Sequence, residues 1–202
     1  LIEEHRHEPK DDILSALIAA TDEGDRLNER ELVATCVLLL IAGFETTVNL
    51  IGNGTLALIE HPTEQAKLRD DLAILPNAVE EMLRYDSPVQ LTSRVVGHDT
   101  ELADGRKLAR GHEIISLLGG ANRDPVVFES PSRFDVTRAN AGQHLSFSTG
   151  IHHCLGAALA RMEARAAFAA LLRRGVLEQA GPAARRPTMV LRGLASLPVR
   201  VG

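Results

Sequence analysis

One stretch of ten residues, FSTGIHHCLG at 147–156, contains two histidines, a cysteine and two glycines. The cysteine, Cys154, comes directly before a predicted helix at 155–174. At that position the unpaired N–H groups and the positive end of the helix dipole stabilise a thiolate, the form of cysteine that binds metals and acts as a nucleophile. Gly150 and Gly156 permit unusual backbone angles and let a flat ligand approach the chain. The stretch therefore has the residue types of a thiolate ligand or nucleophile.

The same residues permit two other interpretations. A lone cysteine before a helix is usually buried and inert, whereas in a reactive site Phe147 can shield the sulfur from water. A zinc site is the other alternative, but His152, His153 and Cys154 are adjacent, and sequence neighbours rarely converge on one tetrahedral ion. The remaining histidines are scattered, with no CxxC or HxxxH spacing. All three interpretations stay open at this point.

An acid and two alcohols interrupt a long apolar helix predicted at 28–60, in the sequence AGFETT. Thr46 can bond the carbonyl of Ala42, four residues earlier, which loosens the helix locally. Gly43 in the same turn costs about 1 kcal/mol relative to alanine. A widened turn can hold a water, and Glu45 can relay protons to it from solvent. The alternative is a back-bonded threonine beside a surface glutamate, so this pattern alone does not establish chemistry.

These residues require a mainly helical framework to position them. Apolar periodicity and turn residues predict helices at 11–22, 28–60, 63–72, 77–86 and 155–174, short strands within 91–118 and near 188–201, and loops at 123–153. Asn28 and Glu31 form a capping-box pattern at the start of the long helix, and Pro62 ends it. Gly24 and Asp25 are expected to end the preceding helix.

Composition narrows the function classes. With 202 residues, 45% of them hydrophobic, the chain can bury a sizeable core. A net charge of −5 argues against a nucleic-acid partner. Two cysteines are too few for a disulfide framework and favour a reducing, cytoplasmic compartment. The most apolar stretch, 33–44, suits a buried core helix and is too short to span a bilayer, so no membrane partner is expected.

The stretch 147–156 resembles the haem-binding loop of the cytochrome P450 family of haem-thiolate monooxygenases, with Ser148 where the family usually has glycine. The resemblance implies that Cys154 is the axial thiolate of haem b and that His152 contacts a haem propionate. Phe147, Gly150 and Gly156 of the same stretch would then belong to the cofactor site. His153 occupies a variable position and is given no role.

The sequence AGFETT resembles the family's oxygen-activation segment, which crosses the haem opposite the thiolate. The resemblance implies that Glu45 and Thr46 are the acid–alcohol pair that delivers protons to bound dioxygen, and that Ala42 lies at the cofactor. Phe44 stands where the family often has histidine.

Three further segments match the family. The sequence AVEEMLRYDSPVQ resembles its Glu-x-x-Arg helix, which implies a structural network of Glu81, Arg84 and Arg133. Arg94 matches an arginine that pairs with a haem propionate, and ANRDP at 121–125 is another family segment. The residues before Arg94 that are expected to line the substrate pocket are Val89, Gln90 and Leu91.

Together these matches imply the mainly α cytochrome P450 fold with small accessory β-sheets, and residues 1–202 as its C-terminal half, with the N-terminal half absent. The first residue is leucine, which suits a fragment. The implied reaction inserts one oxygen atom from O2 into an apolar organic substrate. Electrons would come from NAD(P)H through ferredoxin reductase and ferredoxin, in a soluble bacterial enzyme of the cytoplasm.

A second hypothesis is a haem-free or catalytically silent relative that acts as a binding partner. The presence of Cys154, Glu45, Thr46 and Arg94 argues against it, because a silent relative need not keep them. We also expect that 1–202 alone does not hold haem tightly, and that one side of the long helix around Leu38 is exposed.

Overall fold

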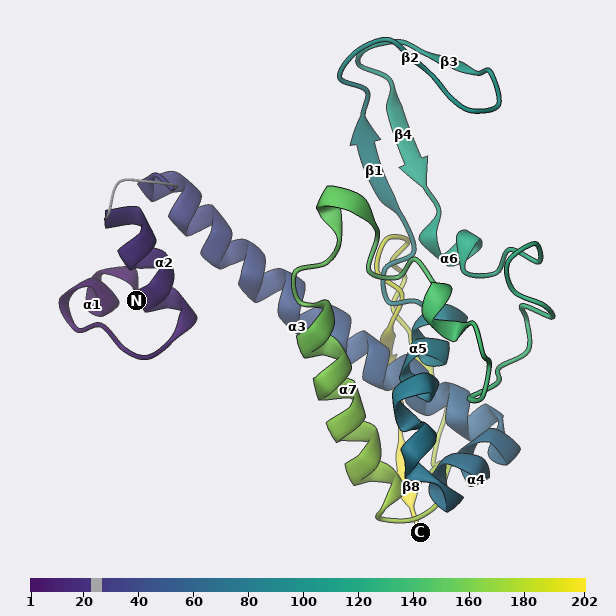
Figure 1. The fold of residues 1–202 in the computed structure, drawn as a ribbon. Coiled ribbons are helices and arrows are strands. Elements are labelled where there is room, and N and C mark those ends of the chain that lie inside the picture. Colours follow the sequence, from purple (N-terminus) through teal and green to yellow (C-terminus); the bar gives the residue numbers. More distant parts are fainter. Residues whose placement is uncertain (23–26) are drawn as a thin grey trace. The chain divides into compact units, whose positions relative to one another are not determined.

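The computed structural model describes residues 1–22 and 27–202, and the chain forms two compact units, Leu1–Glu45 and Thr46–Gly202 (Figure 1). The boundary falls inside the long helix α3, which runs over Glu29–Glu60. The helix end expected at Gly24 and Asp25 lies outside the described residues.

The first unit contains α1 (Ile2–His7), α2 (Ile13–Asp22) and the beginning of α3. The predicted capping box is confirmed. The side-chain oxygen of Asn28 accepts hydrogen bonds from the N–H groups of Arg30 (3.0 Å) and Glu31 (3.1 Å), and the Glu31 carboxylate accepts one from the Asn28 N–H (2.8 Å). These bonds satisfy donors that a helix start would otherwise leave unpaired, which fixes where α3 begins.

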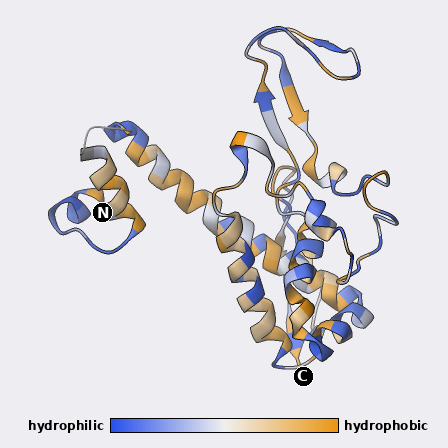
Figure 2. Cartoon of the chain, in the orientation of Figure 1, coloured by the Kyte–Doolittle hydropathy of each residue, from blue (hydrophilic) through white to orange (hydrophobic). Residues whose placement is uncertain are grey.

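Hydrophobic residues are frequent along the first half of α3 (Figure 2), and several of their side chains are exposed. Leu40 is 75% exposed and Phe44 is 72% exposed, and Leu38 and Ile41 are exposed as well. By length and composition alone, α3 is apolar enough to cross a membrane, with a mean hydropathy of 1.8 over 18 residues. This corrects the expectation that its apolar stretch is too short, although core helices of soluble proteins meet the same criteria.

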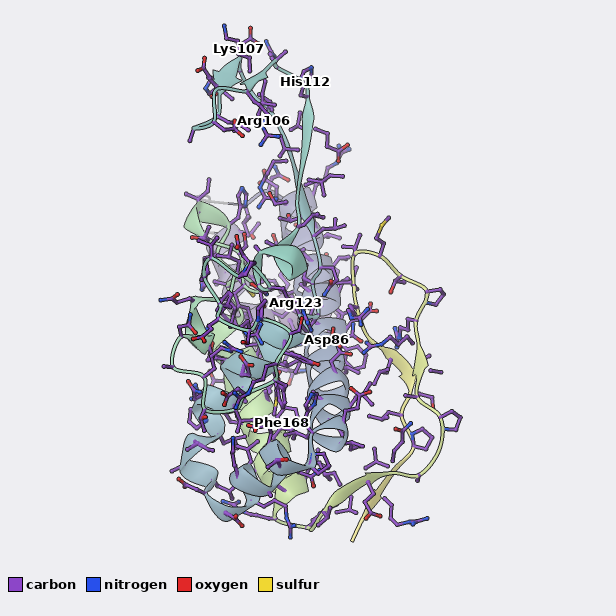
Figure 3. All side chains as sticks on the ribbon, turned by 90° about the vertical axis from the view of Figure 1, so that its right-hand side faces the viewer. Asp86, Arg106, Lys107, His112, Arg123 and Phe168 are labelled. Carbon is purple, nitrogen blue, oxygen red and sulfur yellow. The ribbon has the colours of Figure 1, made fainter. Side chains whose placement is uncertain are left out.

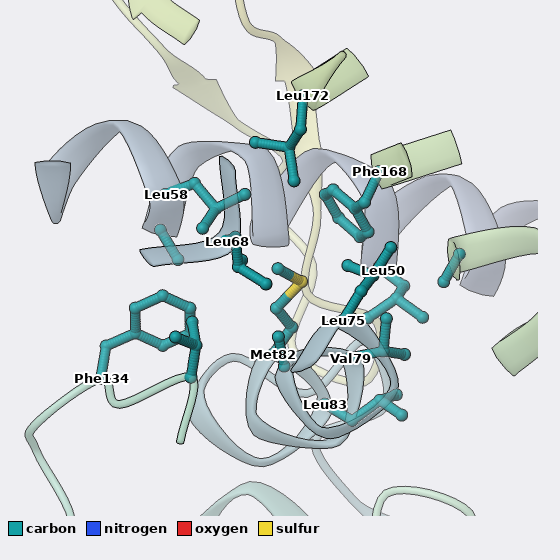
Figure 4. Close-up of a cluster of buried hydrophobic side chains, with 14 of the residues drawn as sticks. Leu50, Leu58, Leu68, Leu75, Val79, Met82, Leu83, Phe134, Phe168 and Leu172 are labelled. Atoms are coloured by element: carbon teal, nitrogen blue, oxygen red, sulfur yellow. The ribbon is translucent and has the colours of Figure 1, made fainter. Parts of the chain in front are cut away.

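The second half of α3 is a core helix of the second unit. It packs with α4 (Pro62–Asp70), α5 (Leu75–Tyr85) and α7 (Ala157–Leu172) around one hydrophobic cluster (Figure 4). Close packing depends on Gly54, because a Cβ there would lie 2.6 Å from the Cζ of Phe168 and 2.8 Å from the Sδ of Met82. The members of the cluster on α3 and α5 include Leu50, Ala57, Leu58, Leu75, Val79 and Leu83.

Four two-stranded antiparallel sheets complete the second unit, which confirms the prediction of small sheets. The pairs are β1 (Thr92–Val95) with β4 (Glu113–Ser116), β2 (Thr100–Glu101) with β3 (Lys107–Leu108), β5 (Leu177–Gln179) with β8 (Val199–Val201), and β6 (Ala184–Arg185) with β7 (Leu194–Ser196). The strands β5 and β6 fall where the sequence indicated an irregular tail. The β1–β4 ribbon carries β2 and β3 at its far end, with Arg106 and Lys107 at the tip (Figure 3).

The connection between β4 and α7 is mostly loop, as predicted. It contains the short helix α6 (Leu118–Ala121) and single turns of 3-10 helix at Ala141–Gln143 and Gly150–His152. This connection carries the cysteine stretch, so its anchoring to the helices decides where the sulfur lies.

Candidate functional site

The cysteine stretch is a closed loop in front of α7. The N–H of Cys154 donates to the carbonyl of Phe147 (2.9 Å), and the N–H of His153 donates to the carbonyl of Gly150 (3.0 Å). Gly150 has a φ of +66°, a region that glycine adopts without strain. Helix α7 begins at Ala157, so Cys154 lies three residues before it rather than directly before it.

The sulfur at the end of this loop is free and faces solvent. The Cys154 thiol forms no disulfide, and its residue is exposed, which contradicts the interpretation of a buried, inert cysteine. The neighbouring apolar side chains Ile151 and Leu155 are 98% and 89% exposed. Nothing lies within 4 Å of the position that a Cβ would take at Gly150. The loop therefore surrounds one thiol with uncovered apolar surface and open space, as a flat apolar ligand requires.

The segment ANRDP has a structural role in holding the loop. Asn122 is fully buried; its side-chain carbonyl accepts a hydrogen bond from the Leu145 N–H (2.7 Å), and its amide donates to the Ser146 hydroxyl (2.8 Å). The Ser146 hydroxyl in turn donates to the carbonyl of Leu83 on α5 (2.7 Å). The chain leading into the cysteine loop is thus tied to α5 by buried polar bonds, which are costly to break.

The predicted Glu-x-x-Arg pair is a buried ion pair. The Glu81 carboxylate accepts two hydrogen bonds from the Arg84 guanidinium, at 2.6 Å and 2.9 Å, and both side chains are fully buried. The guanidinium also donates to the backbone carbonyls of three residues in the following loop, Asn122, Pro131 and Arg133. The geometry is that of a structural pair, because Nε and both terminal nitrogens of the Arg84 guanidinium donate to protein oxygens.

The third member of this network is Arg138, and the expectation that it is Arg133 is wrong. The Arg138 Nε lies 3.1 Å and 3.2 Å from the two carboxylate oxygens of Glu81. The Arg133 side chain is 65% exposed and lies 3.6 Å from Asp135. Arg133 contributes its backbone carbonyl, which accepts hydrogen bonds from Arg84 and from Arg138.

A second ion-pair cluster lies beside the first, and sequence reasoning missed it. The Glu80 carboxylate binds Arg161 of α7, with Nε at 2.7 Å, and the Nε2 of His144 at 3.0 Å. Burial raises the pKa of Glu80, but the hydrogen bonds from His144 and Arg161 outweigh it and lower the pKa to about 2. The partners are far apart in the chain, so no spacing pattern could indicate them.

The other predicted cofactor and catalytic residues lie on α3, on β1 and on the cysteine loop. Glu45 and Thr46 are half-buried in the middle of α3, which is α-helical over Glu29–Glu60. His152 is exposed on the cysteine loop. Arg94 is exposed on β1, where its guanidinium donates to the Thr92 hydroxyl (2.7 Å) and the Ser93 carbonyl (2.6 Å). Ala42 is exposed in the first half of α3.

The residues expected to line a substrate pocket are half-buried, and one of them faces a polar cavity. Gln90 donates from its side chain to the Ser87 carbonyl (2.7 Å) and lines a cavity of about 340 Å³. The other walls of that cavity include Asp86, Arg123 and Arg192; Asp86 and Arg123 are labelled in Figure 3. Val89 pairs with Leu191 in an isolated bridge. An apolar pocket around Val89 and Leu91 therefore stays a prediction.

Comparison with known proteins identifies the family. The family model for cytochrome P450 matches residues 1–189. The chain belongs to the cytochrome P450 family. It is 50% identical over 205 residues to the putative cytochrome P450 140 of Mycobacterium tuberculosis, covering 100% of this chain and 47% of that protein. It is 48% identical to cytochrome P450 107B1 of Saccharopolyspora erythraea, covering 100% of this chain and 51% of the relative. The P450 chain thus spans about half the length of these curated relatives.

Solved P450 structures confirm the fold. The structure of P450BioI in complex with an acyl carrier protein superposes with a TM-score of 0.93 at 44% identity, covering 100% of this chain and 51% of that one. The tirandamycin C-bound monooxygenase TamI gives the same TM-score and identity. The cytochrome P450 fold predicted from the motifs is therefore confirmed.

The P450 family implies a haem with a cysteine thiolate ligand, and the residues present fit that group. Cys154 supplies one exposed sulfur, and uncovered Ile151 and Leu155 suit the apolar ring edge. Within the described residues, no three His, Cys, Asp or Glu side chains gather as a metal-binding group, so the zinc alternative has no ligand set. A single axial sulfur on a flat cofactor is the arrangement that these residues permit.

Proposed function

We propose that this chain is the C-terminal half of a haem-thiolate monooxygenase that inserts one oxygen atom from O2 into an apolar organic substrate. The observation that carries the proposal is the exposed, unpaired sulfur of Cys154 on a loop closed to Phe147 and tied to α5 through Ser146. The family match and relatives named as P450 monooxygenases support it. The haem, when bound, supplies the dioxygen activation.

The residues of this chain have distinct proposed roles around that cofactor. Cys154 would hold the haem through its thiolate, which would supply electron density to the iron, and Phe147 would hold the loop closed through its carbonyl. His152 and Arg94 are exposed and can pair with the propionates, since a guanidinium matches a carboxylate with two parallel hydrogen bonds. Thr46 holds a water in the middle of α3, and Glu45 passes protons to it from solvent.

The proposed electron donors are a ferredoxin and its NAD(P)H-dependent reductase. P450BioI is solved in complex with an acyl carrier protein bearing hexadec-9Z-enoic acid. A carrier-bound acyl chain is therefore the alternative to a free apolar substrate. We also propose a cytoplasmic location, which is consistent with both cysteines, Cys36 and Cys154, being free thiols.

The test is the absorbance spectrum of the intact protein, residues 1–202 together with the remaining half, after addition of haem, reduction and treatment with carbon monoxide. We expect the Soret band of the ferrous carbonyl complex to be displaced to the long wavelength that a thiolate ligand produces. A protein that binds no haem supports the alternative, a haem-free or silent P450-like binding partner. A haem complex with an undisplaced band excludes Cys154 as the ligand.

The exposed apolar face on α3 is consistent with a chain that is one half of a larger fold. Leu38, Leu40, Ile41 and Phe44 form a contiguous apolar surface, which soluble proteins normally cover. We propose that the remaining half of the enzyme covers it and adds propionate contacts and much of the substrate pocket. Residues 1–202 without that half would then hold haem weakly.

Replacing Thr46 with alanine is expected to uncouple the reaction. Because the side chain supplies a hydroxyl rather than packing volume, haem content and the substrate-binding constant should stay near those of the wild type. Product formed per NAD(P)H consumed should fall several-fold, with a matching rise in released hydrogen peroxide, since the proton path lacks its hydroxyl. Both products are quantified in the reconstituted system with the redox partners.

The neighbouring Thr47 is the matched control for this variant, because it is the adjacent hydroxyl on the same helix and is also half-buried. Thr47→Ala should leave the coupling unchanged. Equal coupling in wild type and Thr46→Ala would show that the Glu45–Thr46 pair is structural only.

A further inference from the structure

The cluster around Glu80 places an arginine underneath the cysteine loop. Glu80 on α5 accepts hydrogen bonds from the Nε (2.7 Å) and Nη2 (2.9 Å) of Arg161 on α7, the forked arrangement that best fixes a guanidinium. His144 holds the same carboxylate from the loop side through Nε2 at 3.0 Å. Its Nδ1 accepts a hydrogen bond from the Ser146 N–H (3.1 Å), so the ring proton resides on Nε2 and donates to Glu80.

The fixed guanidinium contacts the residue at which the loop is closed. The Cζ of Arg161 lies 4.4 Å from the centroid of the Phe147 ring, within cation–π distance. The same ring packs at 5.8 Å against His144. Phe147 also accepts the hydrogen bond from the Cys154 N–H. Arg161, Phe147 and Cys154 are therefore consecutive members of one chain of contacts.

The Arg161 guanidinium is the member of the ion pair that contacts the cysteine loop, through the Phe147 ring. The hydrogen bond to Glu80 raises the pKa of Arg161, and a negative charge on Cys154 adds to the rise. The pKa of Glu80 depends on burial and on its bonds to His144 and Arg161. Because the site is partly buried, a charge held there acts on its neighbours more strongly than one in bulk water.

We propose that Arg161 is a positioning residue that holds a permanent positive charge against Phe147, the residue whose carbonyl accepts the Cys154 N–H, and thereby raises the reduction potential of the haem. The charge withdraws electron density from the sulfur, and groups around an axial ligand set the potential in this way. Glu80 and His144 keep the guanidinium in place. This inference rests on the proposed function, since it requires the thiolate to bind haem.

The test is the reduction potential of the holoprotein in Arg161→Gln, with Arg165→Gln as the matched control. Arg165 lies one turn further along α7 and is exposed, so its removal changes the net charge equally while solvent screens the effect. We expect Arg161→Gln to lower the reduction potential by about 59 mV. At a fixed applied potential, the ferrous-to-ferric ratio of this one-electron couple would then fall about tenfold. The control should match the wild type.

A second variant, Glu80→Asp, keeps every charge and withdraws the carboxylate from the guanidinium. We expect a smaller shift in the same direction, because Arg161 is then no longer held against Phe147. If Arg161→Gln does not retain haem, the reduction potential of Glu80→Asp tests the inference in its place. If a variant that loads haem has the same reduction potential as the wild type, the inference is overturned.

The outcome also separates this inference from the proposed function. If the wild-type carbonyl spectrum shows the thiolate band while the potentials of Arg161→Gln and Arg165→Gln are equal, only the role of Arg161 fails. If the wild type lacks that band, Cys154 is not the ligand, and both proposals fail together.

Discussion

Replacing Cys154 with serine is expected to abolish the thiolate-type carbonyl band and to reduce product formation to the background of the haem-free protein. The reason is chemical rather than steric: serine is nearly isosteric, but its hydroxyl remains protonated near neutral pH and cannot donate electron density as a thiolate does. The loop should keep its path, because its closing bond uses the backbone N–H of residue 154 and the Phe147 carbonyl. The absorbance spectrum and product analysis of the holoprotein provide the measurement.

Cys36 offers the control, since it is the other cysteine of the chain, is also a free thiol, and lies on α3 outside the loop. Cys36→Ser should retain both the displaced band and the activity. A displaced band that persists in Cys154→Ser would contradict the assignment of the ligand and, with it, the proposed function.

Arg84→Ala is expected to lower the free energy of unfolding by about 3–5 kcal/mol, the usual cost of removing one partner of a buried ion pair. The Glu81 carboxylate would keep only Arg138 as a charged partner, in a site from which water is excluded. Three backbone carbonyls of the following loop would also lose their donor. Urea denaturation of the holoprotein, followed by far-ultraviolet circular dichroism, measures the change.

Arg133→Ala and Arg138→Ala provide the comparison within the same loop. The Arg133 side chain is largely exposed, so its removal should cost about 0.5 kcal/mol or less. Arg138→Ala should be clearly more destabilising, because its guanidinium contacts Glu81 directly. If Arg133→Ala proved as damaging as Arg84→Ala, the assignment of Arg138 to the network would be incorrect.

Features that depend on neighbouring residues could be predicted from the sequence. The start of α3 follows from Asn28 and Glu31, because a capping box uses side chains three residues apart. The prediction of a haem-binding loop at 147–156 came only through a family resemblance, since the composition of the loop alone left an inert cysteine and a zinc site open. The short strands followed from turn residues, although β5 and β6 were missed.

Features that depend on tertiary contacts could not be predicted in the same way. Arg133 and Arg138 lie on one loop, and the guanidinium that faces Glu81 is that of Arg138, which the spacing of the two arginines does not reveal. The bond between Glu80 and Arg161 joins α5 to α7 and has no local signature. Residues of this kind are visible only after the helices are packed.

The buried arginines have a further consequence for the loop that follows α6. Arg84 and Arg138 hold this loop by peptide oxygens, which every amino acid provides, and not by its side chains. At these contacts the course of the loop therefore depends on the side chains at positions 84 and 138, and exposed positions such as Val126 are free to vary in a lineage or a designed library. The carbonyl oxygens that the two guanidinium groups contact are those of Asn122, Glu129, Ser130, Pro131 and Arg133.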